Sequence, residues 1–360
     1  MAEPFAGGLE SHTVWTARAL MRQGHDVTVF AGPASEPVPS DIDVVSIIDE
    51  SPDFSGVKRR DTQMSRQSEA AVTSGYERVL GAIAESRFDV VHNNSLHFIP
   101  VLHDGGFPVP MVHVVHCPPF DELETAHRSR RARFTADALG DVIAVSESLA
   151  SQWRDLTTAV VPNGIPVADF SPESLVRAGE HCVWAGRMVE EKAPHLAIDA
   201  ARLAGRHIVL AGPVQHQDYF DRMVAPRLGP DAQYLGHLDH RALRSIYSTA
   251  AVGLITPQWD EPFGLVVAEM LAAGTPVAAF DRGALRSVAP ESVAAYATSN
   301  DASALAVAVD DAATRDRSAC RSHARRHLSD EAMAQRYVGL YLRAIERQNL
   351  QPTDQHRRPA

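Results

Sequence analysis

The chain has 360 residues, 45% of them hydrophobic, so it can bury large cores and form two domains more readily than one. Its formal net charge of -11 argues against a general nucleic-acid binder, which needs a broad basic surface to neutralise phosphates. Three cysteines without metal-type spacing predict reduced thiols, and the lack of a signal-peptide pattern or a bilayer-spanning apolar run predicts a cytoplasmic protein.

The first half alternates between helical and strand patterns. Helical periodicity runs through residues 9–23 and is closed by Gly24, after which 26–32 predicts a buried strand. Further β-branched runs, with helical segments between most of them, lie at 42–48, 88–95, 109–116, 141–148 and 158–165. Such runs are typical of parallel sheets, so this half predicts a doubly wound α/β domain.

The start of the sequence departs from that pattern. A doubly wound domain normally opens with a central strand, whereas this sequence opens on a Gly-rich turn. We therefore expect the first N-terminal strand to be missing: either the fold lacks it or the sequence begins late.

The second half repeats the α/β alternation. The Pro-rich segment 162–172 suits a linker, and the strands expected after it lie at 181–187, 207–213, 232–237, 250–256 and 275–281. A last amphipathic helix is predicted for 330–347 and a disordered tail for 348–360. We predict a first domain of residues 1–165 and a second of 166–329, with the last helix packing back toward the first.

The stretch EPFGLVVAE, residues 261–269, places two carboxylates around an apolar segment. Pro262 removes a backbone donor and Gly264 permits an unusual backbone, so we expect Glu261 on a loop and Glu269 inside the helix that follows. The two carboxylates are then expected to contact different parts of one ligand.

Two cations and a glycine pair suggest an anion site. Arg187 and Lys192 lie between a strand end and a helix start, where free N–H groups and the helix dipole favour a diphosphate. Gly7 and Gly8 open the first helix and would let a ligand approach the backbone. Two surface cations and a plain turn are the alternatives. The sequence has neither a GxGxxG nor a Walker loop, so NAD and P-loop chemistry lose their usual support.

His116 ends a predicted strand of the first half, at the sheet edge where α/β folds bind ligands. His113 lies three residues earlier on the opposite face of the strand, so joint metal ligation is not expected. A packed histidine is the alternative for His116, and His92 and His97 are weaker candidates of the same kind.

Two charged motifs have a simpler interpretation. Asp41 and Asp43 form a DxD sequence, but it lies away from the other motifs, so a solvated turn is favoured over a metal site. A cluster of arginines, at positions 128, 130, 131 and 133, is interpreted as a solvated helix face. A patch for an anionic acceptor, or a weak peripheral contact with a membrane, is the alternative.

Together these motifs resemble family 4 of the GT-B glycosyltransferases. Five of them occur in that family's order: Gly7-Gly8, VSES at 145–148, VPNGI at 161–165, Arg187 with Lys192, and EPFGLVVAE at 261–269. The resemblance covers nearly the whole chain and implies the GT-B fold, in which two Rossmann-like domains face each other across a cleft. It also implies a retaining transferase that moves a hexosyl unit from a UDP- or GDP-sugar to an acceptor, here an unidentified small molecule, lipid or glycan.

The resemblance also implies roles for individual residues. Glu261 would hold hydroxyls of the donor sugar, Glu269 the ribose, and His116 would lie near the reacting sugar. The diphosphate would be bound by Arg187 and Lys192 and by backbone N–H groups at Gly8, Gly264 and Leu265, and the base would lie near Gly212, Leu235 and His237. Because fixed cations and helix N–H groups stabilise the leaving diphosphate, we expect no metal ion and no cofactor to be required.

Two other classes of function stay open from the sequence. A nucleotide-sugar epimerase or a phosphorolytic enzyme could use the same fold, although no motif identifies a pyridoxal-phosphate lysine. A non-catalytic nucleotide-sugar binding protein would fit the missing first strand, since an exposed sheet edge would unsettle the loop at Gly7-Gly8.

Overall fold

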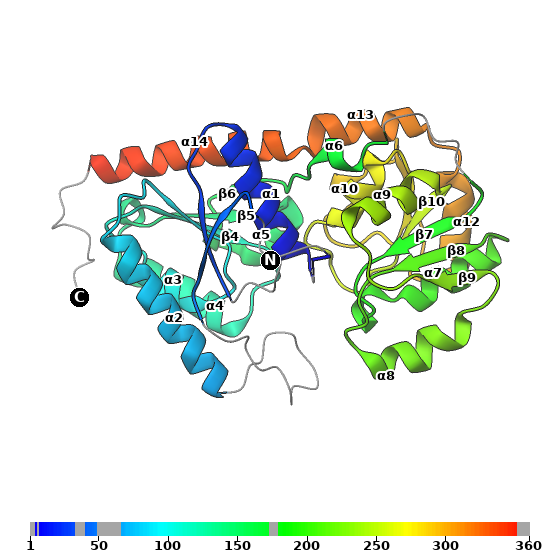
Figure 1. The fold of residues 1–360 in the computed structure, drawn as a ribbon, viewed down its shortest axis with the longest axis horizontal. Helices are drawn as coiled ribbons and strands as arrows, with labels where there is room; N and C mark the ends of the chain where they lie inside the picture. The colour runs from blue at the N-terminus through cyan, green and yellow to red at the C-terminus, as the bar shows by residue number, and fades with distance from the viewer. Residues whose placement is uncertain (1–3, 6, 33–39, 49–65, 173–178, 351–360) are drawn as a thin grey trace.

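The computed structural model describes residues 4–5, 7–32, 40–48, 66–172 and 179–350 of the chain. Two α/β halves lie side by side, and the start of α1 lies where they meet (Figure 1). Within the described residues, the named strands of both halves pair in parallel, as the β-branched runs predicted.

The first half contains every strand that the sequence predicted for it. Its elements are α1 (Gly8–Arg22), β1 (Thr28–Ala31), β2 (Asp43–Ser46), α2 (Arg66–Ala84), β3 (Val91–Asn93), α3 (Phe98–His103), β4 (Met111–Val115), α4 (Asp121–Arg133), η1 (Ala136–Ala138), β5 (Asp141–Ala144), α5 (Glu147–Trp153), η2 (Arg154–Leu156) and β6 (Ala159–Val160). The strands form two sheets, β1-β2 and β3-β4-β5-β6. Within the described residues no strand pairs with the second edge of β1 or of β3, so the two sheets stay separate.

The second half is one six-stranded sheet in the order β12-β11-β10-β7-β8-β9. Its elements are β7 (Cys182–Ala185), η3 (Glu190–Lys192), α7 (Pro194–Leu203), β8 (Ile208–Ala211), α8 (Gln217–Tyr219), η4 (Phe220–Val224), η5 (Ala225–Arg227), β9 (Ala232–Tyr234), α9 (His240–Thr249), β10 (Val252–Ile255), α10 (Leu265–Ala272), β11 (Val277–Ala279), α11 (Leu285–Val288), β12 (Ala294–Tyr296), α12 (Ala302–Ala312) and α13 (Arg317–His327). The sequence did not predict β12, because its three residues are Ala-Ala-Tyr and lack a β-branched run.

The chain crosses between the halves twice, and the two crossings lie against each other. After the short helix α6 (Val167–Phe170) the chain enters the second half, and it returns between α13 and α14 (Asp330–Asn349). Ile165 N–H donates to the Leu328 carbonyl at 2.9 Å, and Asp330 N–H donates to the Ile165 carbonyl at 2.9 Å. A side chain at Gly164 would overlap the backbone of Ser329, so only glycine allows the close approach.

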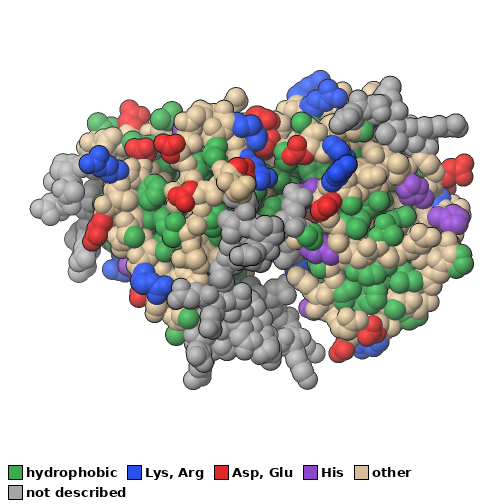
Figure 2. All heavy atoms as spheres, in the orientation of Figure 1, with side chains coloured by type: hydrophobic (Ala, Val, Ile, Leu, Met, Phe, Trp, Pro, Cys, Tyr) green, Lys and Arg blue, Asp and Glu red, His purple; other side chains and the backbone are tan. Residues whose placement is uncertain are grey.

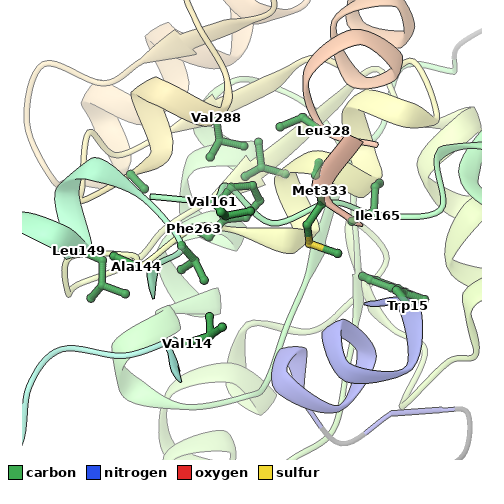
Figure 3. Packing of buried hydrophobic residues seen from close by; sticks show 14 of the residues in the cluster. Trp15, Val114, Ala144, Leu149, Val161, Ile165, Phe263, Val288, Leu328 and Met333 are labelled. Atoms are coloured by element: carbon green, nitrogen blue, oxygen red, sulfur yellow. The ribbon is translucent and has the colours of Figure 1, made fainter. Parts of the chain in front are cut away.

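One apolar cluster continues across this junction. Trp15 and Ile165 from the first half, Phe263 from the second, and Met333 from α14 belong to the same cluster of buried side chains (Figure 3). Such a shared core buries apolar surface that neither half could bury alone, and it therefore stabilises their contact.

The last helix, α14, runs back along the first half (Figure 1). Arg22 of α1 contacts Asp330 at its start, with 2.6 Å between nitrogen and oxygen, and Arg347 near its end contacts Asp141 at 2.7 Å. The helix ends at Asn349, two residues beyond the predicted end, and residues 351–360 of the predicted tail lie outside the described residues.

A buried polar network joins the strands and helices of the first half. The Asp104 carboxylate lies 2.6 Å from Arg130 and 3.2 Å from His113, and it accepts a hydrogen bond from Gly140 N–H at 2.9 Å. Burial alone would raise the pKa of Asp104, but Arg130 and His113 outweigh it and hold the pKa below its usual value. Asn93 completes the network at His113, 2.9 Å away.

The predicted charged motifs form ion pairs, and these are exposed except at Arg130, where the expectation of a solvated helix face is wrong because the side chain is buried against Asp104. Arg128 pairs with Glu124, and Arg131 pairs with Asp155, while Arg130 points inward to Asp104. On the face drawn in Figure 2, Lys and Arg side chains are scattered among Asp and Glu. Asp41 of the DxD motif pairs with Arg18 at 2.8 Å. Within the described residues, no helix is both long enough and apolar enough to cross a bilayer.

Candidate active site

A cavity of about 350 Å³ lies between the two halves, where the carboxyl ends of several parallel strands meet. Ligands of α/β folds bind at such strand ends. All but one of the predicted site residues line it: Gly8, His116, Arg187, Lys192, Gly212, His237, Glu261, Gly264, Leu265 and Glu269. Leu235 does not belong to the lining, and 44% of its surface is exposed.

The segment EPFGLVVAE folds as predicted. Gly264 caps α10 with a left-handed backbone, φ 96°, which favours glycine, and the helix begins at Leu265. Glu261 therefore lies on the loop before the helix, while Glu269 lies within it and is 6% exposed. Ser146 of the VSES motif donates its hydroxyl to the Pro262 carbonyl at 2.7 Å, so the first half helps to hold this loop.

The glycine loop of the first half faces the start of α10. Gly8 begins α1, and a Cβ added to it would lie 3.1 Å from Leu265 Cδ1. The backbone N–H groups at the start of both helices thus border the same cavity. Helix N-termini carry partial positive charge, so this wall of the cavity suits an anion.

Lys192 and Glu261 contact each other directly in the cavity wall. Lys192 Nζ lies 2.6 Å from Glu261 Oε2, and the side chains are 24% and 12% exposed. The Lys192 ammonium also lies 5.3 Å from the centre of the Trp259 ring. The cation proposed for the phosphate and the carboxylate proposed for the sugar therefore belong to one ion pair.

The backbone of Lys192 is held by a residue that the sequence did not indicate. Thr256, buried after β10, donates its hydroxyl to the Lys192 carbonyl at 2.7 Å and accepts a hydrogen bond from Trp184 Nε1 at 3.1 Å. Ala193, which follows Lys192 in the chain, has a left-handed backbone with φ 45°, which is strained for a residue with a side chain. Such strain persists where surrounding contacts impose it, as Thr256 does here.

Arg187 leaves the end of β7 and forms the second cation of the cavity. Its guanidinium donates to Gln215 Oε1 at 2.9 Å and lies 3.4 Å from Glu191 Oε1. Gly212 follows β8 on the neighbouring strand, and a side chain there would overlap the Gly186 carbonyl. The missing side chain lets the two strand ends approach closely beside Arg187.

Glu269 has a buried partner at the inner end of the cavity. Tyr247 donates its hydroxyl to Glu269 Oε2 at 3.2 Å, and both side chains line the cavity. Burial raises the pKa of Glu269, while His240 and the Tyr247 hydroxyl oppose the rise. Sequence patterns did not indicate Tyr247 as a site residue, because its hydrogen bond to Glu269 joins positions 22 residues apart.

His116 lies in the cavity wall and its ring is neutral near pH 7. His116 Nε2 lies 2.8 Å from Asn94 Oδ1, and the His12 ring packs edge-on against it with 4.7 Å between centres. Burial, reinforced by the nearby His92, lowers the pKa of His116 to about 3. His113 points the other way, into the Asp104 network, as its position on the strand predicted.

The two weaker histidine candidates lie outside the cavity lining. His92 lies 2.6 Å from the Tyr341 hydroxyl on α14. His97 caps α3 by accepting from Ile99 N–H at 3.3 Å, and it stacks against Tyr76. Both are therefore packed histidines with structural contacts.

Gly283 supports Glu261 from behind, and its replacement provides a test. Its φ is +60°, a Cβ there would overlap the Glu261 carbonyl, and Ala284 N–H donates to the same carbonyl at 2.8 Å. We expect Gly283→Ala to displace Glu261 and lower kcat/KM for sugar transfer at least about tenfold, because small displacements of reacting groups are costly. The control Gly81→Ala, in α2 with open space around it, should leave transfer unchanged; equal activity of the two variants would contradict the supporting role.

Metal ligands do not converge in the described part of the chain: no group of three or more His, Cys, Asp or Glu side chains is placed to hold an ion. The three cysteines are free, as predicted. The charged groups that border the cavity are instead Arg187, Lys192, Glu261 and Glu269.

Two parallel α/β halves around a shared cavity, with cations and helix N-termini in its wall, form the arrangement expected of the GT-B fold. Residues 6–169 match the pattern of Glycosyltransferase Family 4, and residues 179–328 match Glycosyl transferases group 1. The chain belongs to glycosyltransferase family 4, as its motifs indicated.

Individual relatives agree with this assignment. The glycogen synthase of Mycobacterium tuberculosis is 28% identical over 321 residues, which span 78% of this chain and 75% of that protein. The D-inositol 3-phosphate glycosyltransferase of Xylanimonas cellulosilytica is 27% identical over 346 residues, 80% and 78% of the two chains. The phosphatidyl-myo-inositol mannosyltransferase of Mycolicibacterium smegmatis is 28% identical over 308 residues, 78% and 74%.

Solved structures share the fold. The sucrose-phosphate synthase of Thermosynechococcus elongatus has a TM-score of 0.75 at 21% identity and covers 94% of both chains. Anabaena HepE in complex with UDP-glucose has a TM-score of 0.70 at 18% identity, covering 94% of this chain and 97% of that one.

Proposed function

We propose that this protein is a retaining, metal-independent glycosyltransferase that moves a hexosyl unit from a UDP- or GDP-sugar to an acceptor hydroxyl. The observation that carries the proposal is the contact between Lys192 and Glu261 in the wall of a cavity that also contains Arg187 and the start of α10. Arg187, Lys192 and the start of α10 suit a diphosphate, and the carboxylate of Glu261 suits sugar hydroxyls. A nucleotide sugar presents those two chemistries next to each other.

The transfer replaces one bond to the sugar by another. The bond from the anomeric carbon to the diphosphate oxygen breaks, and a bond to the acceptor oxygen forms. Negative charge grows on the diphosphate as it leaves, so Arg187, Lys192 and the N–H groups at the start of α10 would stabilise the transition state more than the ground state. Attack from the face that the diphosphate leaves would retain the anomeric configuration, with the acceptor proton passing to the leaving oxygen.

The other residues of the cavity would bind the rest of the donor. Glu269, with Tyr247 on one oxygen, would hold the ribose hydroxyls, and the surface around Gly212 and His237 would contact the base. The likeness to HepE, whose structure was solved in complex with UDP-glucose, supports a uridine donor. The mannosyltransferase relative, whose name includes phosphatidyl-myo-inositol, supports a lipid or polyol acceptor.

We also propose a cytoplasmic location, where nucleotide sugars and reduced thiols coexist. In α4, Arg128 and Arg131 pair with carboxylates and Arg130 is buried, so these three side chains do not form an unpaired basic patch for anionic lipid. Any weak contact of this protein with a membrane surface would then be made by residues outside α4 or through a lipid acceptor bound in the cavity.

Nucleotide binding tests the donor part of the proposal. UDP, GDP, ADP, UDP-glucose and GDP-mannose are added to the protein and the melting temperature is measured, because a ligand of the native state stabilises it by about 2.7 kcal/mol at 100 times its Kd. We expect one nucleoside diphosphate to raise the melting temperature and Arg187→Ala to abolish the rise. The control Arg202→Ala, which removes an exposed pair with Asp231 outside the cavity, should keep it. No shift with any nucleotide would contradict the proposal.

The reaction itself is tested with the donor found in this way. The product is expected to keep the anomeric configuration of the donor by NMR, and the rate is expected to be unchanged by EDTA. Conversion of the donor alone to a different sugar would identify an epimerase instead. An inverted product or loss of activity with EDTA would contradict retention or metal independence, respectively.

A further inference from the structure

A row of hydrogen bonds connects the cavity to the last helix. His116 Nε2 lies 2.8 Å from Asn94 Oδ1, and the same oxygen lies 3.0 Å from His92 Nε2. His92 Nδ1 in turn lies 2.6 Å from the hydroxyl of Tyr341 on α14. Asn94 and His116 directly follow the paired strands β3 and β4, so the sheet itself brings them together.

The row fixes where the protons are. An amide oxygen only accepts hydrogen bonds, so the Nε2 atoms of both histidines must carry hydrogen. A neutral imidazole has a single N–H, which leaves Nδ1 of each ring as an acceptor. In His92 this atom accepts the Tyr341 hydroxyl. In His116 it stays as the acceptor nitrogen of a ring that lines the cavity.

The surroundings keep both rings uncharged. Burial lowers the pKa of His92 to about 4 and that of His116 to about 3. The groups packed against them are His12 on α1 and the rings of Tyr337 and Tyr341 on α14. Burial also lowers the pKa of His12, so α1 presents a neutral ring to His116.

Nearby groups of the cavity complete this environment. Cys117 follows His116 in the chain, and burial raises the pKa of its thiol to about 11, so it is uncharged near pH 7. The charged groups of the lining are Lys192, Glu261, Arg187 and the buried Glu269, all from the second half. Among the described lining residues of the first half, the ring of His116 therefore meets uncharged groups.

We propose that Asn94 is a positioning residue that holds His116 neutral, with Nδ1 presented to the cavity as a hydrogen-bond acceptor for a substrate hydroxyl. His92 and Tyr341 hold the Asn94 amide in the required orientation from behind. The inference rests on the proposed transferase function, because a sugar or acceptor hydroxyl is the donor that such a nitrogen recognises. Protonation of His116 would turn Nδ1 from a hydrogen-bond acceptor into a donor, so the ring could no longer accept a hydrogen bond from the substrate hydroxyl.

The tautomer of His116 tests the proposal without any substrate. The full-length protein, labelled with ¹⁵N in histidine, is studied by long-range ¹H–¹⁵N NMR from pH 5 to 8.5, with His116→Gln for assignment. We expect His116 to show the neutral form with hydrogen on Nε2 throughout. Hydrogen on Nδ1, or titration of His116 within this range, would overturn the proposal. This result does not depend on the nucleotide screen, so its failure is distinct from failure of the proposed function.

Two variants test the role of Asn94 itself. In Asn94→Asp a carboxylate accepts the same N–H groups but favours the imidazolium, so His116 should titrate within the NMR range. With UDP-glucose or GDP-mannose as donor, kcat/KM should fall about tenfold at pH 6 and recover toward pH 8.5. Asn94→Ala should lose about tenfold at every pH. An equal loss in Asn94→Asp at all pH values, without titration of His116, would mean a merely structural role and overturn the proposal.

Discussion

Glu261→Gln is expected to lower the rate of sugar transfer by about 1000-fold while leaving the fold and nucleoside diphosphate binding intact. The substitution keeps the shape of the side chain but removes the charge that pairs with Lys192 at 2.6 Å. Groups that stabilise developing charge in a closed site typically contribute about 100- to 1000-fold each. The amide would no longer pair with Lys192 as a carboxylate does, so the donor sugar would lose its alignment while the diphosphate stays bound.

The neighbouring carboxylate provides a matched control. The side chain of Asp260 is 58% exposed and its carboxylate lies 3.9 Å from Arg282, so Asp260→Asn should transfer sugar at the wild-type rate. Initial rates at saturating donor separate kcat from KM, and calorimetry with UDP or GDP checks binding. A near-wild-type kcat for Glu261→Gln would reject the role of Glu261 in the reaction.

Asp104→Ala is expected to cost about 3–5 kcal/mol of the unfolding free energy of the first half. Removing this carboxylate leaves Arg130 charged, with its side chain only 3% exposed, and breaking a buried pair from one side costs about that much. The lowered pKa of Asp104 also means that its carboxylate stabilises the folded state. This contribution to the unfolding free energy is fully present above the unfolded pKa, near 3.9, and is lost as the pH falls through the folded pKa.

Chemical denaturation at pH 7, followed by fluorescence and circular dichroism, measures this loss. The control Asp41→Ala removes an exposed pair of the same half, with 36% and 50% of the side chains accessible, and should change stability by less than about 1 kcal/mol. If Asp104→Ala were as stable as Asp41→Ala, the buried network would not hold the domain together in the way described.

The site residues that the sequence predicted share a local signature. Pro262 and Gly264 define the loop and the start of α10, and Arg187 and Lys192 follow directly from a strand end and a helix start. Each of these signals depends on a few consecutive residues, and the parallel sheet then places all of them at one edge. Strand positions were predictable for the same reason, since β-branched runs mark them.

Other parts of the site depend on distant pairs, which a single sequence does not reveal. His92 and Tyr341 contact each other across 249 positions, and Thr256 reaches the Lys192 carbonyl across 64. Leu235, which we expected near the base, follows the end of β9 and does not belong to the cavity lining. Its predecessor Tyr234 instead reaches the cavity region, because its hydroxyl donates to the Gly212 carbonyl at 2.7 Å.

The histidines of the first half have a consequence for its tolerance of acid. Burial lowers the pKa of six of them: His12, His92, His97, His113, His116 and His127. An unfolded chain binds protons at these rings below about pH 6.5, whereas the folded chain does not, so acidification favours unfolding. The same packing that keeps His116 neutral therefore makes this half sensitive to acid. When the domain unfolds in mild acid, all of these histidines become accessible and bind protons together.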